Sequence, residues 1–233
     1  MNINVSRSFS YHLPLTVLVI SLFIIYLNTL APGLTWANGG SDGGDLITAA
    51  YTGGIAHPSG YPLYLLLARL FQFLPIGSLA FRTNLLSMVA AIGSAVLIYE
   101  LVVRALENLE RKYACLAGVA AGLAFGLSPL IWSQAVITEV YTLQAFLTVS
   151  ILSLSAYSFR GVPPKKMENI RGLVFGLAMG NHITTFFLIP LILFSENIKT
   201  DDSRQDENDD GRKVQQGAHG QAPDFGAPLV RHG

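Results

Sequence analysis

Two carboxylates and one imidazole occur close together in a glycine- and proline-rich stretch, residues 36–62, which apolar segments enclose on both sides. Asp42 and Asp45 are three positions apart, and His57 follows within the same stretch. A carboxylate that accepts the proton of an attacking hydroxyl lowers the barrier to its reaction, which makes Asp42 the candidate general base. Asp45 can orient that base, cap the next helix or hold a divalent cation with Asp42, although such aspartates are also common turn residues. We therefore interpret the stretch as the working loop of an enzyme.

Two arginines and His57 are candidates for binding a phosphate-bearing substrate. Arg69 and Arg82 bracket a short apolar segment after the loop. A guanidinium group can hold a phosphate through two hydrogen bonds, and it can equally reach out of an apolar surface toward water. His57 can donate a hydrogen bond to the same phosphate, or it can shape the turn before the proline that follows it.

Glu139 and His182 are the remaining candidates for substrate binding. Glu139 is the one charged residue between positions 113 and 159, which makes it a site hypothesis, with a helix cap as the alternative. Tyr141 beside it can contact a sugar or belong to an aromatic belt at the membrane surface. His182 lies deep in an apolar segment, where a hydrogen bond between helices is the favoured interpretation over catalysis.

The composition is that of a membrane protein. The chain is 51% hydrophobic and 13% charged, with a mean hydropathy of +0.45, whereas soluble domains contain about a quarter charged residues. A formal net charge of zero without a basic block excludes a nucleic-acid-binding function. The single cysteine, Cys115, excludes an internal disulfide and argues against a thiol-based metal site; we expect no metal or cofactor, with a divalent cation as the open alternative.

Hydropathy predicts an all-α, polytopic transmembrane bundle of about five spans within residues 13–194. The first outer loop, residues 31–82, is expected to contain one or two short juxtamembrane helices, because residues 63–73 are too few to cross a bilayer. Charge density rises sharply in residues 195–233, which we expect to be a disordered tail. The predicted spans are about 13–30, 83–101, 113–132, 140–159 and 172–194.

Positive residues indicate which side of the membrane the loops face. Basic residues occur near the N-terminus, after the second span and after the fourth span, so these regions are expected to be cytoplasmic. Residues 1–12 then form a cytoplasmic N-terminus, the first span is an uncleaved anchor, and loop 31–82 and Glu139 lie outside. We expect a multi-pass protein of a bacterial cytoplasmic membrane whose active loop is extracytoplasmic.

Two glycine stripes predict close helix packing. Gly118, Gly122 and Gly126 recur at every fourth position in the third span, and Gly172, Gly176 and Gly180 do the same in the fifth. Residues four apart lie on one helix face, and a glycine face lets another helix approach closely in lipid.

Four sequence blocks resemble one membrane protein family. The blocks lie in order between residues 42 and 184, and they are D-G-G-D-L-I-T-A-A-Y-T-G-G-I-A-H-P-S-G-Y-P-L-Y, F-R-T-N-L-L-S, W-S-Q-A-V-I-T-E-V-Y and G-L-A-M-G-N-H-I-T. They resemble the N-terminal part of the DUF2723 family, the TMEM260-like protein O-mannosyltransferases, which is similar to the GT-C glycosyltransferases. Where the family usually has D-S-G-E, this chain has Asp42-Gly43-Gly44-Asp45, which keeps both carboxylates.

The resemblance implies an inverting membrane glycosyltransferase. It would take a sugar from a polyprenyl-phosphate-linked donor and transfer it to an acceptor hydroxyl on a protein or glycan, outside the cytoplasm, with a first-loop aspartate as base. Family members continue through further spans, so we expect this chain to be a fragment that is inactive or weakly stable alone. A transporter with re-entrant segments and a non-catalytic membrane assembly or lipid-binding subunit are the competing hypotheses.

Overall fold

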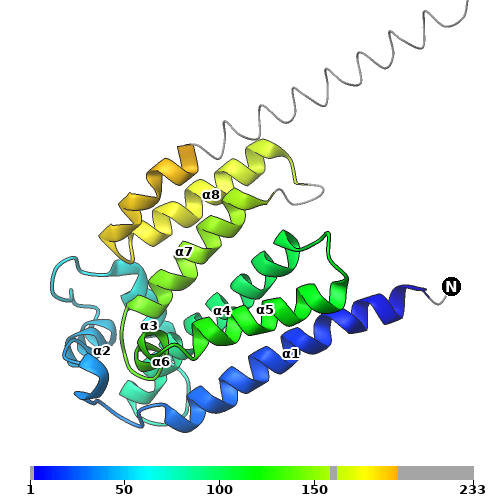
Figure 1. Ribbon diagram of the computed structural model, residues 1–233. Helices are drawn as coiled ribbons and strands as arrows, with labels where there is room; N and C mark the ends of the chain where they lie inside the picture. The colour runs from blue at the N-terminus through cyan, green and yellow to red at the C-terminus, as the bar shows by residue number, and fades with distance from the viewer. Residues whose placement is uncertain (1–2, 158–161, 194–233) are drawn as a thin grey trace, which may run out of the picture. The chain divides into compact units, whose positions relative to one another are not determined.

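The computed structural model describes residues 3–157 and 162–193, which contain α-helices and 3₁₀ helices and no strand (Figure 1). Contacts divide the chain into two units, Met1–Ile189 and Pro190–Gly233, and the architecture below is that of the first. The described residues therefore confirm the all-α prediction. The predicted disordered tail, residues 195–233, lies outside the described residues.

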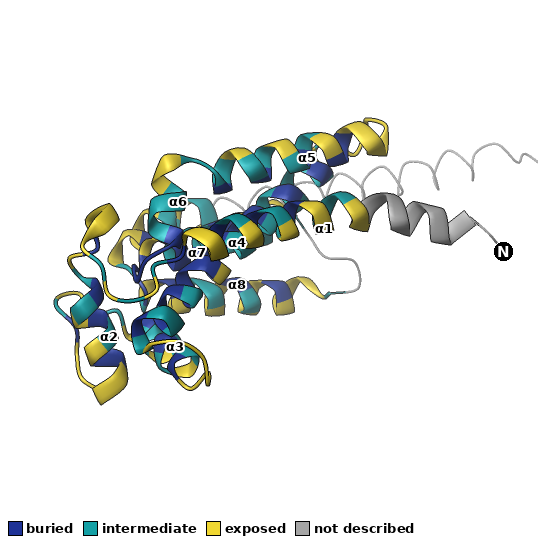
Figure 2. Ribbon diagram, turned by 90° about the horizontal axis from the view of Figure 1, so that it is seen from below, coloured by how far each residue is buried: buried dark blue, intermediate teal, exposed yellow. Residues whose placement is uncertain are grey.

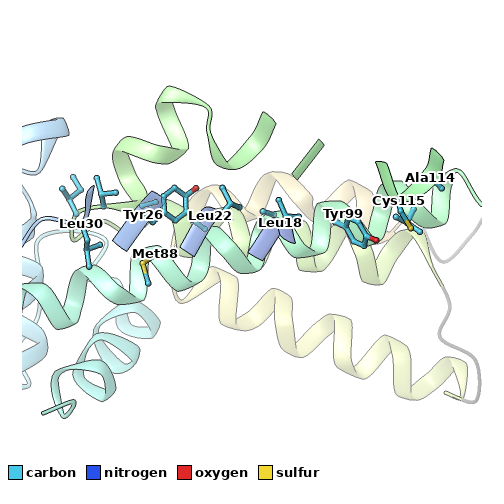
Figure 3. Packing of buried hydrophobic residues seen from close by; sticks show 14 residues of the cluster. Leu18, Leu22, Tyr26, Leu30, Met88, Tyr99, Ala114 and Cys115 are labelled. Atoms are coloured by element: carbon cyan, nitrogen blue, oxygen red, sulfur yellow. The ribbon is translucent and has the colours of Figure 1, made fainter. Parts of the chain in front are cut away.

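Three long helices form the core of the first unit: α1 (Ile3–Thr29), α4 (Leu79–Ala105) and α5 (Arg111–Gly126). Their apolar side chains interlock along the length of the bundle (Figure 3). Because these buried side chains contact one another across all three helices, the helices form one packed body. The cluster includes Leu18, Leu22, Tyr26, Leu30, Met88, Ala91, Ala95, Tyr99, Val103, Ala114 and Cys115.

The first glycine stripe is packed as the spacing predicts. A Cβ atom at Gly122 would lie 2.7 Å from Leu18 Cδ2, and one at Gly126 would lie 2.8 Å from Leu22 Cδ2. At Gly118 the near neighbours belong instead to α4. The absence of side chains along this face is what allows α5 to lie directly against α1 and α4.

In the second stripe a Cβ atom at Gly180 would lie 3.8 Å from Leu63 Cβ, but the other two glycines have no such partner among the described residues. A Cβ atom at Gly172 or Gly176 would meet no described atom within 4 Å. The prediction of close packing is thus confirmed for α5 and is not met in the described part of α8 (Pro164–Met179).

Within residues 3–157 and 162–193, two helices are long and apolar enough to cross a membrane: His12–Thr29 within α1, and α4. A third candidate is the pair formed by α5 and α6 (Pro129–Ala135), which are bent by 67° at a short break. Pro129 begins α6 because proline lacks the amide hydrogen that would continue α5. The described residues thus give two or three candidate spans and do not confirm the five that hydropathy predicts.

The last two predicted spans differ from their expected form. Helix α7 (Tyr141–Ala156) has 16 residues, which is short for a crossing. The segment predicted at 172–194 is interrupted: α8 ends at Met179, and the 3₁₀ helix η2 (Ile183–Leu188) follows. His182 between them is extended, with φ −154° and ψ 135°, so the helix cannot run on through it.

Loop 31–82, which the sequence predicts to lie outside, contains short helices as expected. It contains η1 (Ala37–Gly39), α2 (Gly43–Thr52) and α3 (Pro62–Gln72). In Figure 1 helices α2, α3 and α6 gather at the end of the bundle where α1 ends and α7 begins, and the view in Figure 2 agrees. This end of the bundle carries the candidate site.

Helix α3 buries one face and exposes another (Figure 2). Tyr64 and Ala68 are fully buried, while Leu66, Leu70 and Phe73 are more than half exposed. Residues three and four apart share a helix face, so the exposed residues form an apolar stripe. A stripe of this kind is typical of a helix that lies in a membrane interface, as the sequence predicts for this segment.

Candidate functional site

His57 bridges the two carboxylates of loop 31–82. Asp45 Oδ2 accepts hydrogen bonds from the His57 main-chain N–H (2.9 Å) and from its ring at Nδ1 (2.8 Å). The other ring nitrogen, Nε2, lies 3.5 Å from Asp42 Oδ2. Because a carboxylate can only accept, Nδ1 must carry the proton that joins it to Asp45. The structure therefore brings together Asp42, Asp45 and His57, all from the stretch that the sequence indicated.

The start of α2 positions both carboxylates. Asp42 is the N-cap of this helix and Asp45 lies in its first turn, where the helix dipole favours negative charge. Ser41 Oγ donates to Asp42 Oδ1 over 3.1 Å. Gly53 ends the helix in a left-handed conformation (φ 72°), which turns the chain back toward His57. Between 36% and 45% of each of the three acidic and imidazole side chains is exposed, so a ligand can reach them.

The two hydrogen bonds from His57 also set the charge state of Asp45. The main-chain N–H, and after it the ring, favour the ionised carboxylate and lower the pKa of Asp45 below its usual value. Asp45 thus remains an anion that holds the imidazole in one orientation. The Nε2 edge of the ring, on the opposite side, is directed to Asp42.

Glu139 joins this group from a distant part of the sequence. It lies just before α7, is only 3% exposed, and is anchored through its main chain: Ser87 Oγ donates to the Glu139 carbonyl (3.1 Å) and accepts from its amide (3.3 Å). Burial, and after it the charge of Asp42, raises the pKa of Glu139 to about 7. Such a carboxyl can both donate and accept a proton near neutral pH.

An aromatic wall, formed by Tyr61, Tyr141 and His182, lies beside the acidic group. The rings of His57 and Tyr61 are 5.2 Å apart at a steep angle, and Tyr61 stacks on His182 with a centroid separation of 6.0 Å. The centroids of Tyr141 and His182 are 6.2 Å apart. His182 therefore lies at the same site as His57, although the sequence favoured a hydrogen bond between helices for it.

Main-chain and amide contacts hold the His182 segment against the loop. The Leu63 amide, in the first turn of α3, donates to the Gly180 carbonyl over 3.0 Å. Asn181 is 1% exposed, and its side chain donates to Gln144 Oε1 (3.0 Å) on α7. Gln144 in turn donates to Thr185 Oγ1 (2.8 Å). The hydrogen bond between helices that the sequence predicted at this position is made by Asn181, beside the histidine.

The two arginines have different surroundings. Arg82 donates to three main-chain carbonyls, those of Ile76 (2.6 Å), Gln72 (2.9 Å) and Gly77 (3.0 Å), and so fixes the turn between α3 and α4. Arg69 instead has its guanidinium 5.0 Å from the ring centres of Tyr51 and Phe73. Within the part of the chain that is described, Arg69 makes no hydrogen bond or ion pair, so its donors are free for a ligand.

No group of three or more histidine, cysteine, aspartate or glutamate side chains within residues 3–157 and 162–193 is arranged to hold a metal ion. A divalent cation held by Asp42 and Asp45 alone stays a prediction. A cavity of about 310 Å³ lies between the end of α4 and the start of α5, lined by Glu100, Arg104, Glu107 and Arg111 among others. None of the candidate site residues lines it.

Six of these residues were predicted from the sequence, and Tyr61 was not. The predicted residues that the structure gathers are Asp42, Asp45, His57, Glu139 and His182, with Tyr141 named only as a neighbour of Glu139. Tyr61 is within the same glycine- and proline-rich stretch, directly before Pro62. That position is the signal that was available, since a residue before proline is restricted in conformation and often lies at a turn.

Residues 42–205 match the family model described as the protein O-mannosyl-transferase TMEM260 N-terminal domain, which is more than half of the chain. The chain belongs to the TMEM260 family. The match begins at Asp42, and it includes every candidate residue of the site. No solved structure matches the chain.

Two members of the TMEM260 family show how the chain relates to longer proteins. Protein O-mannosyl-transferase TMEM260 of Mus musculus is 34% identical over 164 residues, which cover 66% of this chain and 22% of the relative. Protein O-mannosyl-transferase tmem260 of Dictyostelium discoideum is 31% identical over 149 residues, 63% of this chain and 17% of the relative. The chain thus spans about a fifth of the length of these TMEM260 relatives.

Proposed function

We propose that this chain carries the acidic loop of a membrane glycosyltransferase of the GT-C type, which transfers mannose from a polyprenyl-phosphate-linked donor to a protein hydroxyl. The observation that carries the proposal is the Asp42–His57–Asp45 bridge with Glu139 beside it. The names of both relatives, protein O-mannosyl-transferases, supply the sugar and the acceptor.

The reaction that fits this group is a single displacement. The oxygen of the acceptor hydroxyl attacks the anomeric carbon of the sugar and forms the new glycosidic bond. The bond between that carbon and the phosphate oxygen breaks, and the lipid phosphate leaves with the electron pair. The hydroxyl proton passes to Asp42. Attack opposite the leaving group inverts the configuration at the anomeric carbon.

The neighbours of Asp42 support its role as general base. Asp45 keeps His57 in one orientation through two hydrogen bonds, and His57 directs Nε2 to Asp42 across 3.5 Å. A base works best when its position is fixed before the substrate arrives. Glu139, whose pKa of about 7 allows either charge state, can donate to or accept from a sugar hydroxyl at the same place.

Arg69 is our candidate for the donor phosphate. Its guanidinium lies between two aromatic rings on the surface of α3, next to the exposed apolar stripe of Leu66, Leu70 and Phe73. A lipid-linked phosphate approaches a protein from the membrane surface, where such a stripe would lie. Arg82 is the less suitable candidate, because three main-chain carbonyls already accept its hydrogen bonds.

The positive-inside rule supports an extracytoplasmic location for this chemistry. Lys and Arg lie near the start of α1, around the turn from α4 to α5 and in the first half of α8, so the opposite end of the bundle, with α2 and α3, would face outward. We propose that donor and acceptor meet on that face, at the rim of the bilayer.

The test is sugar transfer in membranes of cells that express the gene, measured with radiolabelled polyprenyl-phosphate mannose and a hydroxyl-bearing peptide. Wild type is compared with Asp42→Asn and with Glu168→Gln, a control at an exposed glutamate of α8. Removing a general base typically lowers the rate about 10²- to 10⁴-fold, so Asp42→Asn should lose transfer while the control retains it. Equal transfer by wild type and Asp42→Asn would remove Asp42 from the mechanism.

A further inference from the structure

Tyr61 occupies a backbone conformation that is costly for any residue with a side chain. Its φ of 44° and ψ of 50° lie in the left-handed region, where among the described residues only Asn38 joins it outside the glycines. The Cβ atom of an L-residue crowds its own backbone there, and glycine avoids that cost. Strained residues of this kind cluster at functional sites, where the surroundings hold them in place.

The Tyr61 ring is in contact with two histidines of the candidate site. His57 approaches at 5.2 Å with the ring planes 65° apart, and His182 stacks at 6.0 Å with the planes 29° apart. The first histidine belongs to the acidic loop and the second to the break after α8. The ring is thereby fixed between two segments that are far apart in sequence, and its direction is set before any ligand arrives.

Nothing in the described part of the chain pairs with the hydroxyl group of Tyr61. It makes no hydrogen bond with any residue in the two described ranges, although Tyr61 is partly buried. Partial burial, and after it Tyr141, Asp42 and Glu139, raises the pKa of Tyr61, which agrees with a hydroxyl that lies in the field of these groups. A donor held at this place with no protein acceptor is available to a bound molecule.

We propose that Tyr61 is a sugar-contacting residue, whose hydroxyl donates a hydrogen bond to a hydroxyl oxygen of the donor sugar while His57 and His182 hold its ring. The inference rests on the proposed function and names the part of the donor that this group of residues contacts. Asp42 and Glu139 repel a phosphate but accept hydrogen bonds from a neutral polyol. Carboxylates, imidazoles and a phenol together therefore fit the sugar ring, and the phosphate belongs elsewhere.

The experiment compares two lipids that differ only in the sugar, polyprenyl-phosphate mannose and polyprenyl phosphate. Their affinities for the purified chain in detergent are measured from the rise in melting temperature with ligand concentration. The variants are Tyr61→Phe, which removes only the hydroxyl, and Tyr113→Phe, a control at an exposed tyrosine at the start of α5. Phenylalanine keeps the ring contacts with both histidines.

The expected result is a loss that depends on the sugar. Tyr61→Phe should weaken binding of the mannosyl lipid by about three- to tenfold, the usual effect of one hydrogen bond. Binding of polyprenyl phosphate should not change, and Tyr113→Phe should match wild type with both lipids. Tyr61→Gly, which adopts the left-handed conformation without strain but removes the ring and its hydroxyl, should lose at least as much affinity for the mannosyl lipid.

Three outcomes would overturn the inference. If Tyr61→Phe binds the mannosyl lipid as wild type does, the inference is overturned and the proposed function stays intact. The same holds if Tyr61→Phe loses equal affinity for both lipids, because the hydroxyl would then contact the phosphate or the lipid chain. Wild type that binds neither lipid overturns it together with the lipid-linked donor. Transfer that is lost in Asp42→Asn but unchanged in Tyr61→Phe at limiting donor separates the two proposals in the same assay.

Discussion

Replacing Glu139 with glutamine should stabilise the protein, and by an amount that depends on pH. Glu139 is 3% exposed, and burial with the nearby Asp42 charge raises its pKa from 4.5 to about 7, against smaller opposing effects of the Val140 amide and His57. The folded state thus keeps a proton that the unfolded state releases between pH 4.5 and 7. In that window unfolding becomes easier as pH rises, because the folded state binds more protons.

The magnitude follows from the size of the shift. A rise from 4.5 to about 7 corresponds to about 3 kcal/mol of lost stability once the pH exceeds 7, and to none below pH 4.5. Glutamine has nearly the same shape and carries no charge, so Glu139→Gln avoids this loss. The variant and wild type should therefore be about equally stable near pH 4.5, and the variant should be more stable by up to about 3 kcal/mol at pH 8.

The assay is thermal unfolding of the purified protein in detergent from pH 4.5 to pH 8, with Glu168→Gln as a control for loss of an exposed carboxylate. Sugar transfer by Glu139→Gln should be slower than by wild type, because glutamine cannot exchange a proton at this position. A stability difference between Glu139→Gln and wild type that is the same at every pH would refute the reasoning. It would show that burial does not raise the pKa of the Glu139 carboxyl group.

Two matched pairs of substitutions give the remaining predictions. Gly122→Ala should cost about 1–3 kcal/mol of stability in thermal unfolding, because its Cβ would lie 2.7 Å from Leu18 Cδ2. Gly176→Ala has open space around it and should be neutral or stabilise the protein by about 0.5–1 kcal/mol. Equal effects of the two substitutions would contradict the packing of α5. Arg82→Gln should lower the melting temperature, because it loses hydrogen bonds to three main-chain carbonyls. Arg69→Gln should leave the melting temperature nearly unchanged and weaken binding of polyprenyl phosphate. The reverse pattern would contradict the different surroundings described for the two arginines.

The acidic loop was predictable because its signals are local. Asp42 and Asp45 are three positions apart, and glycine and proline around them predict turns and short helices, which α2 and α3 confirm. His57 is also near in sequence, so one loop can bring it to both carboxylates. Glu139 was recognisable from a different local signal, a lone charge in a long apolar stretch.

The arrangement of the apolar segments was less predictable, because hydropathy measures where a chain is apolar and not where a helix ends. The break at Asn181 depends on tertiary partners: its buried side chain bonds to Gln144 on α7, and the Gly180 carbonyl accepts from the loop. Such contacts supply the hydrogen bonds that an interrupted helix gives up. The contact between Tyr61 and His182 has the same character, since it depends on a fold that must already exist.

The hydrogen bond from the Leu63 amide to the Gly180 carbonyl has a consequence for how the protein is made. Its two ends are separated by most of the first unit, so neither the loop nor the break after α8 can settle before both have left the ribosome and entered the membrane. The bundle of α1, α4 and α5 can pack earlier, from segments synthesised first. The candidate site should thus be the last part to form, and a nascent chain arrested before Gly180 would contain the packed bundle without the complete site.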